Sequence, residues 1–495
     1  MALKKSSQYI PERSFSSKLF SAGIGFFICF IFFINLWVFV TNPFHSLNII
    51  QQPFSTTIKN NQIVLHQNYS LHVVTNPILR AFAYYKSAAH IIANVYLGSP
   101  KTLSLTESGI IAEIHQLRFN PSFPYLISGD HFVVFYPRNL GIFYASTLDS
   151  STALNKNDWE NRQRIFLQST AYALDTFSKL HNTTTTIVPI GSTEVVPINI
   201  FTYPSDSLYG VLYALSQLQQ SGSDVYPLKT QEAAKKLLLS YHKNLEELLL
   251  VYRKTVYDQK TGLIKKSIHL SSARDAAIRQ SSFYDNVIYW KTLSLASNLG
   301  IISIPQDDLD RLKQRIIQAF WYEKGGYFID DLSSDSLSAH SYSSDWLIGV
   351  STGFFDLSNQ MDQQYVTRAI TYIQENKIDK PFGLKYQSAT DRSKEFFFVR
   401  YFVPSYGEDA IWSHWGMEYI KTLELLYQAT QNSAYKRAAK ENLDAYDRNI
   451  VEYRGYPEVY TSSGKFLENI FYKSIRQTGW VVNFEEAKNM YESLH

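Results

Sequence analysis

Apolar residues recur every three or four positions over most of the chain beyond residue 158, which is the spacing that gives a helix one buried face. These stretches divide into ten predicted helices, separated by loops rich in Gly, Ser, Pro and Asp. No alternation of strands with helices is visible there, which argues against a parallel α/β domain. The predicted helices are Trp159–Leu180, Ser205–Gln220, Thr230–Tyr257, Ser282–Leu299, Gln306–Phe320, Ser343–Leu357, Gln363–Glu375, Asp409–Thr430, Ser433–Val451 and Gly479–Ser493.

Helices joined in succession as hairpins predict an all-α toroid, in which an inner ring of helices is enclosed by an outer ring. A solenoid is the alternative, but the helices share no fixed-period motif of the kind that repeat arrays show. The toroid is expected to occupy residues 130–495, and its first segment, Asp130–Asp149, has the pattern of strand and loop.

Residues 42–129 have a different pattern, in which short alternating runs accompany one helical stretch near Ala81–Leu97. This pattern predicts a small mixed α/β region before the toroid.

Leu19–Thr41 is an uncharged apolar run, long enough to cross a bilayer as a helix. No small-residue cleavage site follows it, so an uncleaved anchor is favoured over a cleaved signal peptide or a buried core helix. The basic residues precede it, and the positive-inside rule therefore keeps residues 1–18 in the cytoplasm. These observations predict a single-pass protein of the cell membrane whose body, from Asn42 onward, is exported.

The net charge of +3 comes entirely from residues 1–18, and the remainder is neutral. A neutral body argues against nucleic acid as a partner, because phosphate binding needs concentrated Lys and Arg. Cys29 is the only cysteine, which excludes disulfides and thiolate metal sites. Neither metal-binding nor nucleotide-binding motifs occur, so no metal and no cofactor are expected. Aromatic residues make up 15% of the chain, and their faces would suit the stacking of sugar rings.

Three C-terminal passages resemble, in order and spacing, the six-hairpin (α/α)6 glycosidases, which include trehalase, processing α-glucosidase, mannosylglycerate hydrolase and the glucosidase domain of debranching enzyme. The resemblance covers roughly residues 130–495. The passages are Phe320–Asp330 (FWYEKGGYFID), Tyr406–Gly416 (YGEDAIWSHWG), and Tyr456–Tyr460 (YPEVY) followed by Gln477–Trp480 (QTGW).

The resemblance implies an inverting hydrolase with two carboxyl groups, an acid for the leaving oxygen and a base for the attacking water. Matching the C-terminal motif assigns the base to Glu458. The acid is an Asp of a mid-chain loop, where Asp275 is preferred and Asp285 competes. Asp285 could instead be an acidic first-turn residue of a helix, which the helix dipole favours. Glu458 could instead form a salt contact with Arg454 or Lys465. Asp275 could instead form one with Arg274 or Arg279.

Seven further residues are expected to bind substrate, although structural roles remain open for several of them. Trp412 and Trp415 fall on one helical face, where at least one would pack in the core. Asp345 and Trp346 could cap a helix or line the pocket, and a structural role is equally open for Arg138. The seven are Arg138, Asp345, Trp346, Glu408, Trp412, Trp415 and Trp480.

The sequence thus predicts a membrane-anchored glycoside hydrolase that acts on an envelope or extracellular glycan, its carbohydrate partner. Two alternatives stand beside it: a lyase or epimerase built on the same toroid, and a glycan-binding or scaffold protein that has lost catalysis.

Overall fold

The computed structural model describes residues 52–97, 100–129, 134–201, 203–220, 229–275, 277–388 and 394–494. The predicted anchor Leu19–Thr41 lies outside these ranges. Within them, no helix combines the length and the apolar character that a membrane crossing requires.

Six elements form a closed inner ring in which each packs against the next along the chain, and the last packs against the first. The inner core is therefore built from segments spread over most of the sequence. The six are η2–η3 (Pro137–Leu140 and Ile142–Leu148), α5 (Ser207–Gln220), α7 (Phe283–Asn298), η5–α10 (Ser344–Leu347 and Ile348–Ser351), α13 (Ser413–Thr430) and α15 (Val481–Ser493).

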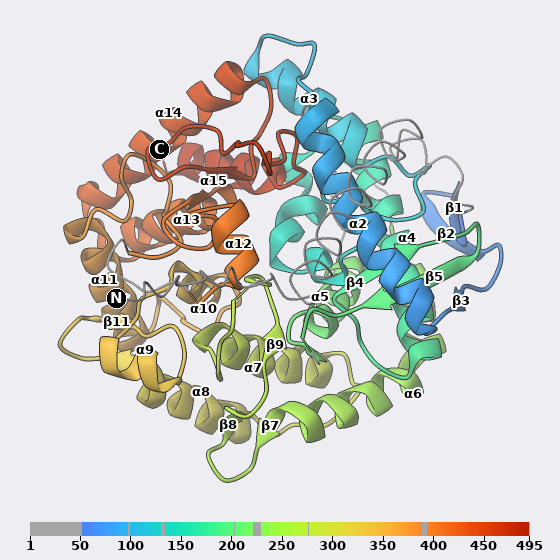
Figure 1. Ribbon diagram of the computed structural model, residues 1–495, viewed down its shortest axis with the longest axis horizontal. Coiled ribbons are helices and arrows are strands. Elements are labelled where there is room, and N and C mark those ends of the chain that lie inside the picture. The colour runs from blue at the N-terminus through green and yellow to red at the C-terminus, as the bar shows by residue number, and fades with distance from the viewer. Residues whose placement is uncertain are drawn as a thin grey trace, which may run out of the picture.

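A second layer of helices surrounds this ring, as Figure 1 shows in projection. Five of them follow an inner element in the chain. The sixth, α3, comes from the region before residue 130 and packs against α14. The outer helices are α3 (Glu107–Arg118), α4 (Lys156–Leu180), α6 (Gln231–Val256), α8 (Gln306–Phe320), α11 (Gln360–Glu375) and α14 (Ser433–Tyr453).

The outer helix α8 shows why these segments are recognisable in the sequence. Its buried residues are Leu309, Leu312, Ile316 and Phe320, a single stripe, and the acidic residues of its first turn suit the helix N-terminus. An inner helix such as α7 is instead buried on most sides, since it touches neighbours in both rings.

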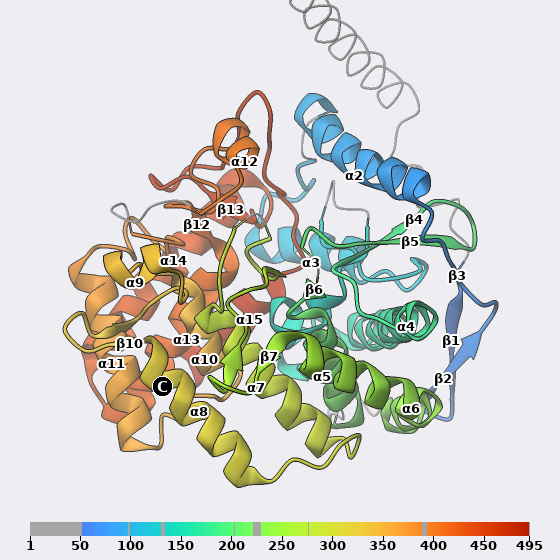
Figure 2. The ribbon, with the colours of Figure 1, turned by 60° about the horizontal axis from the view of Figure 1, so that its bottom comes forward.

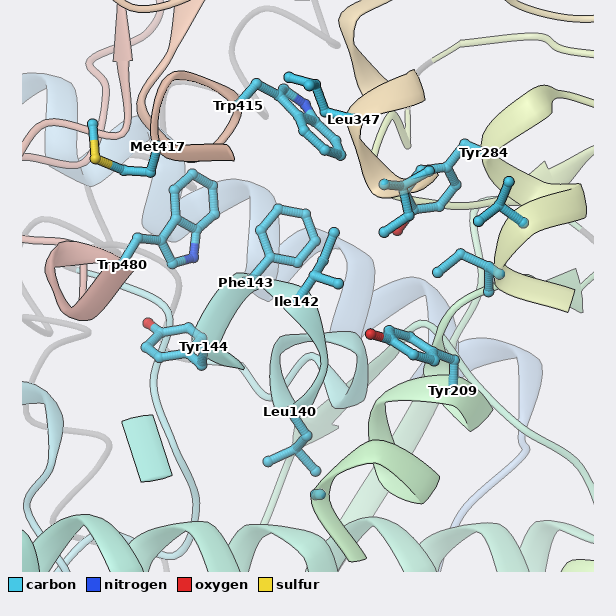
Figure 3. Close-up of a cluster of buried hydrophobic side chains, with 14 of the residues drawn as sticks. Leu140, Ile142, Phe143, Tyr144, Tyr209, Tyr284, Leu347, Trp415, Met417 and Trp480 are labelled. Carbon is cyan, nitrogen blue, oxygen red and sulfur yellow. The ribbon is translucent and has the colours of Figure 1, made fainter. Parts of the chain in front are cut away.

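Apolar side chains fill the axis of the ring, so the toroid is a packed core and not an open tube. Figure 3 shows part of this cluster, to which all six inner elements contribute. Examples from five of them are Phe143, Tyr209, Tyr284, Leu347 and Met417, all of them buried.

Short strands are attached to the toroid. The hairpin of β1 (Phe54–Lys59) and β2 (Gln62–Gln67) packs on α4, and α2 (Pro77–Leu97) packs on β5. The other short elements lie in the segments that connect these strands and helices. They are β3 (His72–Val73), η4 (Ser150–Thr152), β4 (Thr186–Pro189), β5 (Glu194–Ile198), β6 (Tyr203–Pro204), β7 (Tyr257–Asp258), β8 (Leu263–Ile264), β9 (Leu270–Ser271), β10 (Trp321–Tyr322), β11 (Tyr327–Phe328), α9 (Ser334–Ala339), α12 (Phe397–Phe402), β12 (Ile411–Trp412) and β13 (Val459–Tyr460).

The structure corrects three of the predicted elements. The helix predicted at Ser343–Leu357 spans only Ser344–Ser351, and Gly353, with φ of +72°, follows shortly after its end. Asp130–Asp149, as far as it is described, forms 3-10 turns, and its strand pairing is limited to one isolated bridge between Phe135 and Ile187. The helix predicted from Asp409 begins at Ser413, because Ile411 and Trp412 pair with β13. The domain boundary at residue 130 remains a prediction.

Candidate active site

A cleft lies where the loops that precede four inner elements meet. Residues from these loops line it together with two residues of η2 and one of η3. The lining includes three carboxyl groups, two arginines and five aromatic rings. The lining residues are Ser128, Tyr136, Arg138, Asn139, Phe143, Ala273, Arg274, Asp275, Glu395, Tyr406, Gly407, Trp412, Glu458 and Trp480.

The structure brings five of the ten predicted site residues into this one cleft, although they come from loops far apart in the sequence. Their roles in catalysis or binding remain predictions. The five are Arg138, Asp275, Trp412, Glu458 and Trp480.

Asp275 is held by an arginine on the wall of the cleft. Arg138 Nη1 donates to Asp275 Oδ1 at 2.7 Å, and Nη2 donates to Oδ2. Arg138 is buried, whereas the Asp275 side chain keeps 26% of its surface exposed. The partner is therefore Arg138 and not Arg274 or Arg279, which were the salt contacts considered from the sequence.

Glu458 is buried and placed by backbone pairing. Its N–H donates to Ile475 O at 2.9 Å, and its carbonyl accepts from Ser413 N at 3.0 Å. The adjoining strand β13 pairs with β12, which carries Trp412. Burial raises the pKa of Tyr136, and the charges of Asp275 and Glu458 raise it further. Both carboxylates thus lie close enough to one tyrosine to act on it.

Glu395 is the carboxyl group that the sequence analysis missed. It packs against Gly407, where an added Cβ would lie 1.7 Å from Glu395 Oε1, so a larger residue cannot occupy this position without displacing the glutamate. Burial raises the pKa of Glu395 to about 7, against the opposing effect of Arg274. Glu395 therefore carries a proton in a substantial fraction of molecules at neutral pH, unlike an ordinary glutamate. The only signal in the sequence is an acidic residue that stands next to an aromatic run.

Aromatic rings form a connected wall along the cleft. Tyr406 contacts Trp412 with centroids 4.8 Å apart, and Trp412 lies nearly parallel to Trp480 at 6.3 Å. Trp480 in turn stacks on Phe143 at 5.1 Å. Trp412 Nε1 donates to Tyr406 O at 2.7 Å, which fixes the orientation of the indole.

Beneath the cleft, a buried ionic network fixes the loop that carries Asp275. Asp330 faces Arg274 at 3.6 Å, Arg279 at 3.1 Å and Lys394 at 3.5 Å, and Arg279 also binds Asp345 at 2.6 Å. Burial alone would raise the pKa of Asp330, but the three cations outweigh it and hold the pKa below its usual range. Since Arg274 and Lys394 adjoin Asp275 and Glu395, the network positions both carboxyl groups.

Asp330→Asn should destabilise the protein strongly, because it preserves shape but leaves three buried cations short of one negative charge. The expected loss is about 3–5 kcal/mol of unfolding free energy. Thermal unfolding of the purified full-length chain measures it. The matched control is Asp310→Asn, which alters an exposed carboxylate on α8 and should change the midpoint little. Equal midpoints for the two variants would contradict this role of Asp330.

The remaining five predicted site residues lie outside the cleft wall. Trp346 and Trp415 are fully buried in the core and offer no face to a sugar, and buried Asp345 belongs to the ionic network. Glu408 lies at the rim, 3.7 Å from Arg400, and its charge raises the pKa of Glu395. These four residues therefore do not line the cleft, although the charge of Glu408 acts on Glu395, and their roles in substrate binding remain predictions.

Asp285 lies in the first turn of α7. This is the position that the sequence analysis gave as the alternative to a role as the general acid. Its N–H donates to Ser282 Oγ at 3.0 Å, and that hydroxyl donates to Asp285 Oδ2 at 2.7 Å. Burial raises the pKa of Asp285, which is not among the residues that line the cleft. Its contacts are those of a first-turn residue that binds the N-cap, which is Ser282.

His414 packs behind the aromatic wall of the cleft and is not among its lining residues. His414 is enclosed by Phe143, Trp415 and Trp480, and burial holds its pKa well below the usual value, so the ring is neutral. No group of three or more His, Cys, Asp or Glu residues in the described ranges could hold a metal ion.

No protein-family model matches the sequence, and the search of curated proteins finds no relative. Solved structures do match. A cellobiose 2-epimerase from Bacillus thermoamylovorans aligns at a TM-score of 0.51 and 10% identity, over 77% of this chain and 100% of that chain. A mannosylglycerate hydrolase from Thermus thermophilus aligns at 0.49 and 11% identity, over 78% and 100%. A rhamnosidase from Klebsiella oxytoca aligns at 0.48 and 12% identity, over 80% of this chain and only 65% of that chain.

At these identities, the likeness concerns the fold. The match to the cellobiose 2-epimerase, at a TM-score of 0.51, supports the toroid fold that the sequence motifs led us to expect.

Proposed function

We propose that this protein is a glycoside hydrolase whose catalytic groups are the carboxyl groups of the cleft. The observation that carries the proposal is the meeting of Glu458, Asp275 and Glu395 in one aromatic-lined cleft. Hydrolysis of a glycosidic bond needs a proton donor and a base, and aromatic rings suit the apolar faces of sugars. The fold shared with a cellobiose 2-epimerase agrees with a sugar substrate.

Glu458 is the base of the proposed mechanism. It would take a proton from the water that attacks the anomeric carbon, on the face opposite the departing oxygen. Such a displacement inverts the configuration at that carbon.

The surroundings of Glu395 suit a general acid better than those of Asp275 do. A general acid must carry a proton at the working pH, and burial raises the pKa of Glu395 to about 7. Both oxygens of Asp275 accept hydrogen bonds from Arg138, which fixes the orientation of this carboxyl group on the cleft wall. Asp275, the acid favoured from the sequence, would instead orient the sugar through its exposed edge.

The predicted anchor adds a location to the proposal. If Leu19–Thr41 crosses the membrane with the basic residues inside, the cleft faces the exported side. The substrate would then be a glycan of the envelope or of the surroundings.

Product analysis tests this function. The full-length chain, incubated with yeast mannan, dextran, soluble starch and xylan, should release a new reducing end from at least one of them. Proton NMR at early times should show the inverted anomer. An unsaturated product would indicate a lyase, and an altered sugar in an uncleaved chain would indicate an epimerase. Absence of any product from a broader glycan panel would refute catalysis.

A further inference from the structure

An exposed group of aromatic side chains lies beside the cleft. We define the aromatic platform as Phe397, Tyr401, Phe402 and Phe471, which are 82%, 67%, 42% and 46% exposed. Phe397 and Tyr401 are four residues apart on α12, so both rings project from one face of this short helix. Figure 2 shows α12 above the ring, near β12 and β13.

The rings of the platform contact one another and so form a continuous surface. Phe397 and Tyr401 are nearly parallel, with centroids 6.1 Å apart, and Tyr401 contacts Phe402 at 5.3 Å. Phe402 contacts Phe471 at 4.8 Å, and Asn469 Nδ2 donates to Phe402 O at 3.1 Å, which ties α12 to the neighbouring loop.

The platform is linked to the cleft in two ways: its residues adjoin cleft residues in the sequence, and their neighbours pack on the cleft lining. Glu395, a carboxyl group of the cleft, lies two residues before Phe397. Tyr472 follows Phe471 and packs on Tyr406, another lining residue, at 5.4 Å. A ligand that extends out of the cleft on this side would pass over exposed rings.

We infer that the aromatic platform binds the part of a long glycan that extends beyond the cleft, which makes an extended polysaccharide, and not a short saccharide, the preferred substrate. This inference rests on the proposed function and adds the substrate class to it. The C–H faces of successive pyranose rings stack on exposed aromatic faces, and the Tyr401 hydroxyl adds a polar contact.

The charges around the platform favour a glycan over a lipid surface. Membrane-binding patches combine apolar side chains with an excess of Lys and Arg, which attract anionic lipids. Here Arg400 lies 3.7 Å from Glu408, and Lys473 lies 3.6 Å from Glu468, so positive charge is matched by negative charge. A neutral rim suits a neutral polymer.

A double variant, Phe397→Ala with Tyr401→Ala, tests the inference kinetically. KM for the polysaccharide should rise about tenfold while kcat changes little, because the lost contacts lie away from the bond that is cleaved. Activity on a short aryl glycoside should be unchanged. The matched control removes two exposed leucines of α6, Leu239→Ala with Leu250→Ala, and should leave both substrates unaffected.

A binding assay keeps the inference separate from catalysis. Glu458→Gln protein, with and without the platform substitutions, is run in native gels that contain yeast mannan, dextran, soluble starch or xylan. Retardation by at least one glycan, lost on removing Phe397 and Tyr401, supports the platform even if wild type cleaves nothing. The inference is overturned if Glu458→Gln protein with the platform substitutions is retarded as much as Glu458→Gln protein without them. It is also overturned if neither protein is retarded. Labelling of residues 397–402 by a photoactivatable lipid, in vesicles carrying the full-length chain, would also overturn it by identifying a membrane contact.

Discussion

Glu458→Gln should reduce turnover by about 10²–10⁴-fold while substrate binding persists. The amide preserves the size of the side chain and can still form hydrogen bonds, but it cannot take a proton from the attacking water. Because the backbone of Glu458 is held by Ile475 and Ser413, the substitution should not displace the loop. Sugar release measures turnover, and calorimetry with the same glycan measures binding.

The control for this variant is Glu375→Gln, which alters an exposed carboxylate of the outer helix α11 and should retain wild-type turnover. If Glu458→Gln kept full turnover as well, Glu458 could not be the base. If it lost binding together with turnover, the residue would act on substrate affinity and not on water.

Glu395→Gln should give the second largest effect, and one that depends on the leaving group. Turnover of a glycan should fall by about 10²–10⁴-fold, because the departing sugar oxygen needs a proton. An aryl glycoside with a good leaving group should be largely spared. Wild-type turnover should decline as pH rises above 7, since the acid with a pKa of about 7 then loses its proton. The variant should lack this alkaline decline.

Asp275→Asn is the companion experiment. It disturbs the pairing with Arg138 and should therefore slow both kinds of substrate by a similar factor. A leaving-group dependence in Asp275→Asn, together with none in Glu395→Gln, would assign the acid to Asp275. Asp285→Asn should alter thermal stability more than turnover, since Asp285 lies in the first turn of α7 and binds the N-cap residue Ser282.

The helical architecture was predictable wherever one face of a helix is buried. Helix α8 begins and ends at the predicted residues, and the ends of α4 and α6 lie within three residues of the predicted ones. The prediction failed at Ser343–Leu357, where burial on all sides removes the periodic signal and Gly353 adopts a left-handed conformation. It also could not show that α3 joins the outer layer, because that contact depends on the closure of the ring.

The site was predictable only where a motif lies next to a regular element. Glu458 and Trp412 sit beside the paired strands β12 and β13, and both reach the cleft. Trp415 lies three positions after Trp412 but points into the core, a difference that spacing cannot reveal. Glu395 went unrecognised because its importance comes from burial against Gly407, a contact that is made in space and leaves no pattern along the chain.

The closure of the outer layer by α3 has a consequence for the order of folding during synthesis. Arg118, at the end of α3, donates to Gln477 O across 359 positions, and Glu107 pairs with Lys488. At ribosomal speeds of roughly 5–20 residues per second, α3 would wait about 20–70 s for these partners. During that interval the part of α3 that packs against α14 has no native cover, so nascent chains stalled before α14 should be the species that chaperones hold and proteases remove.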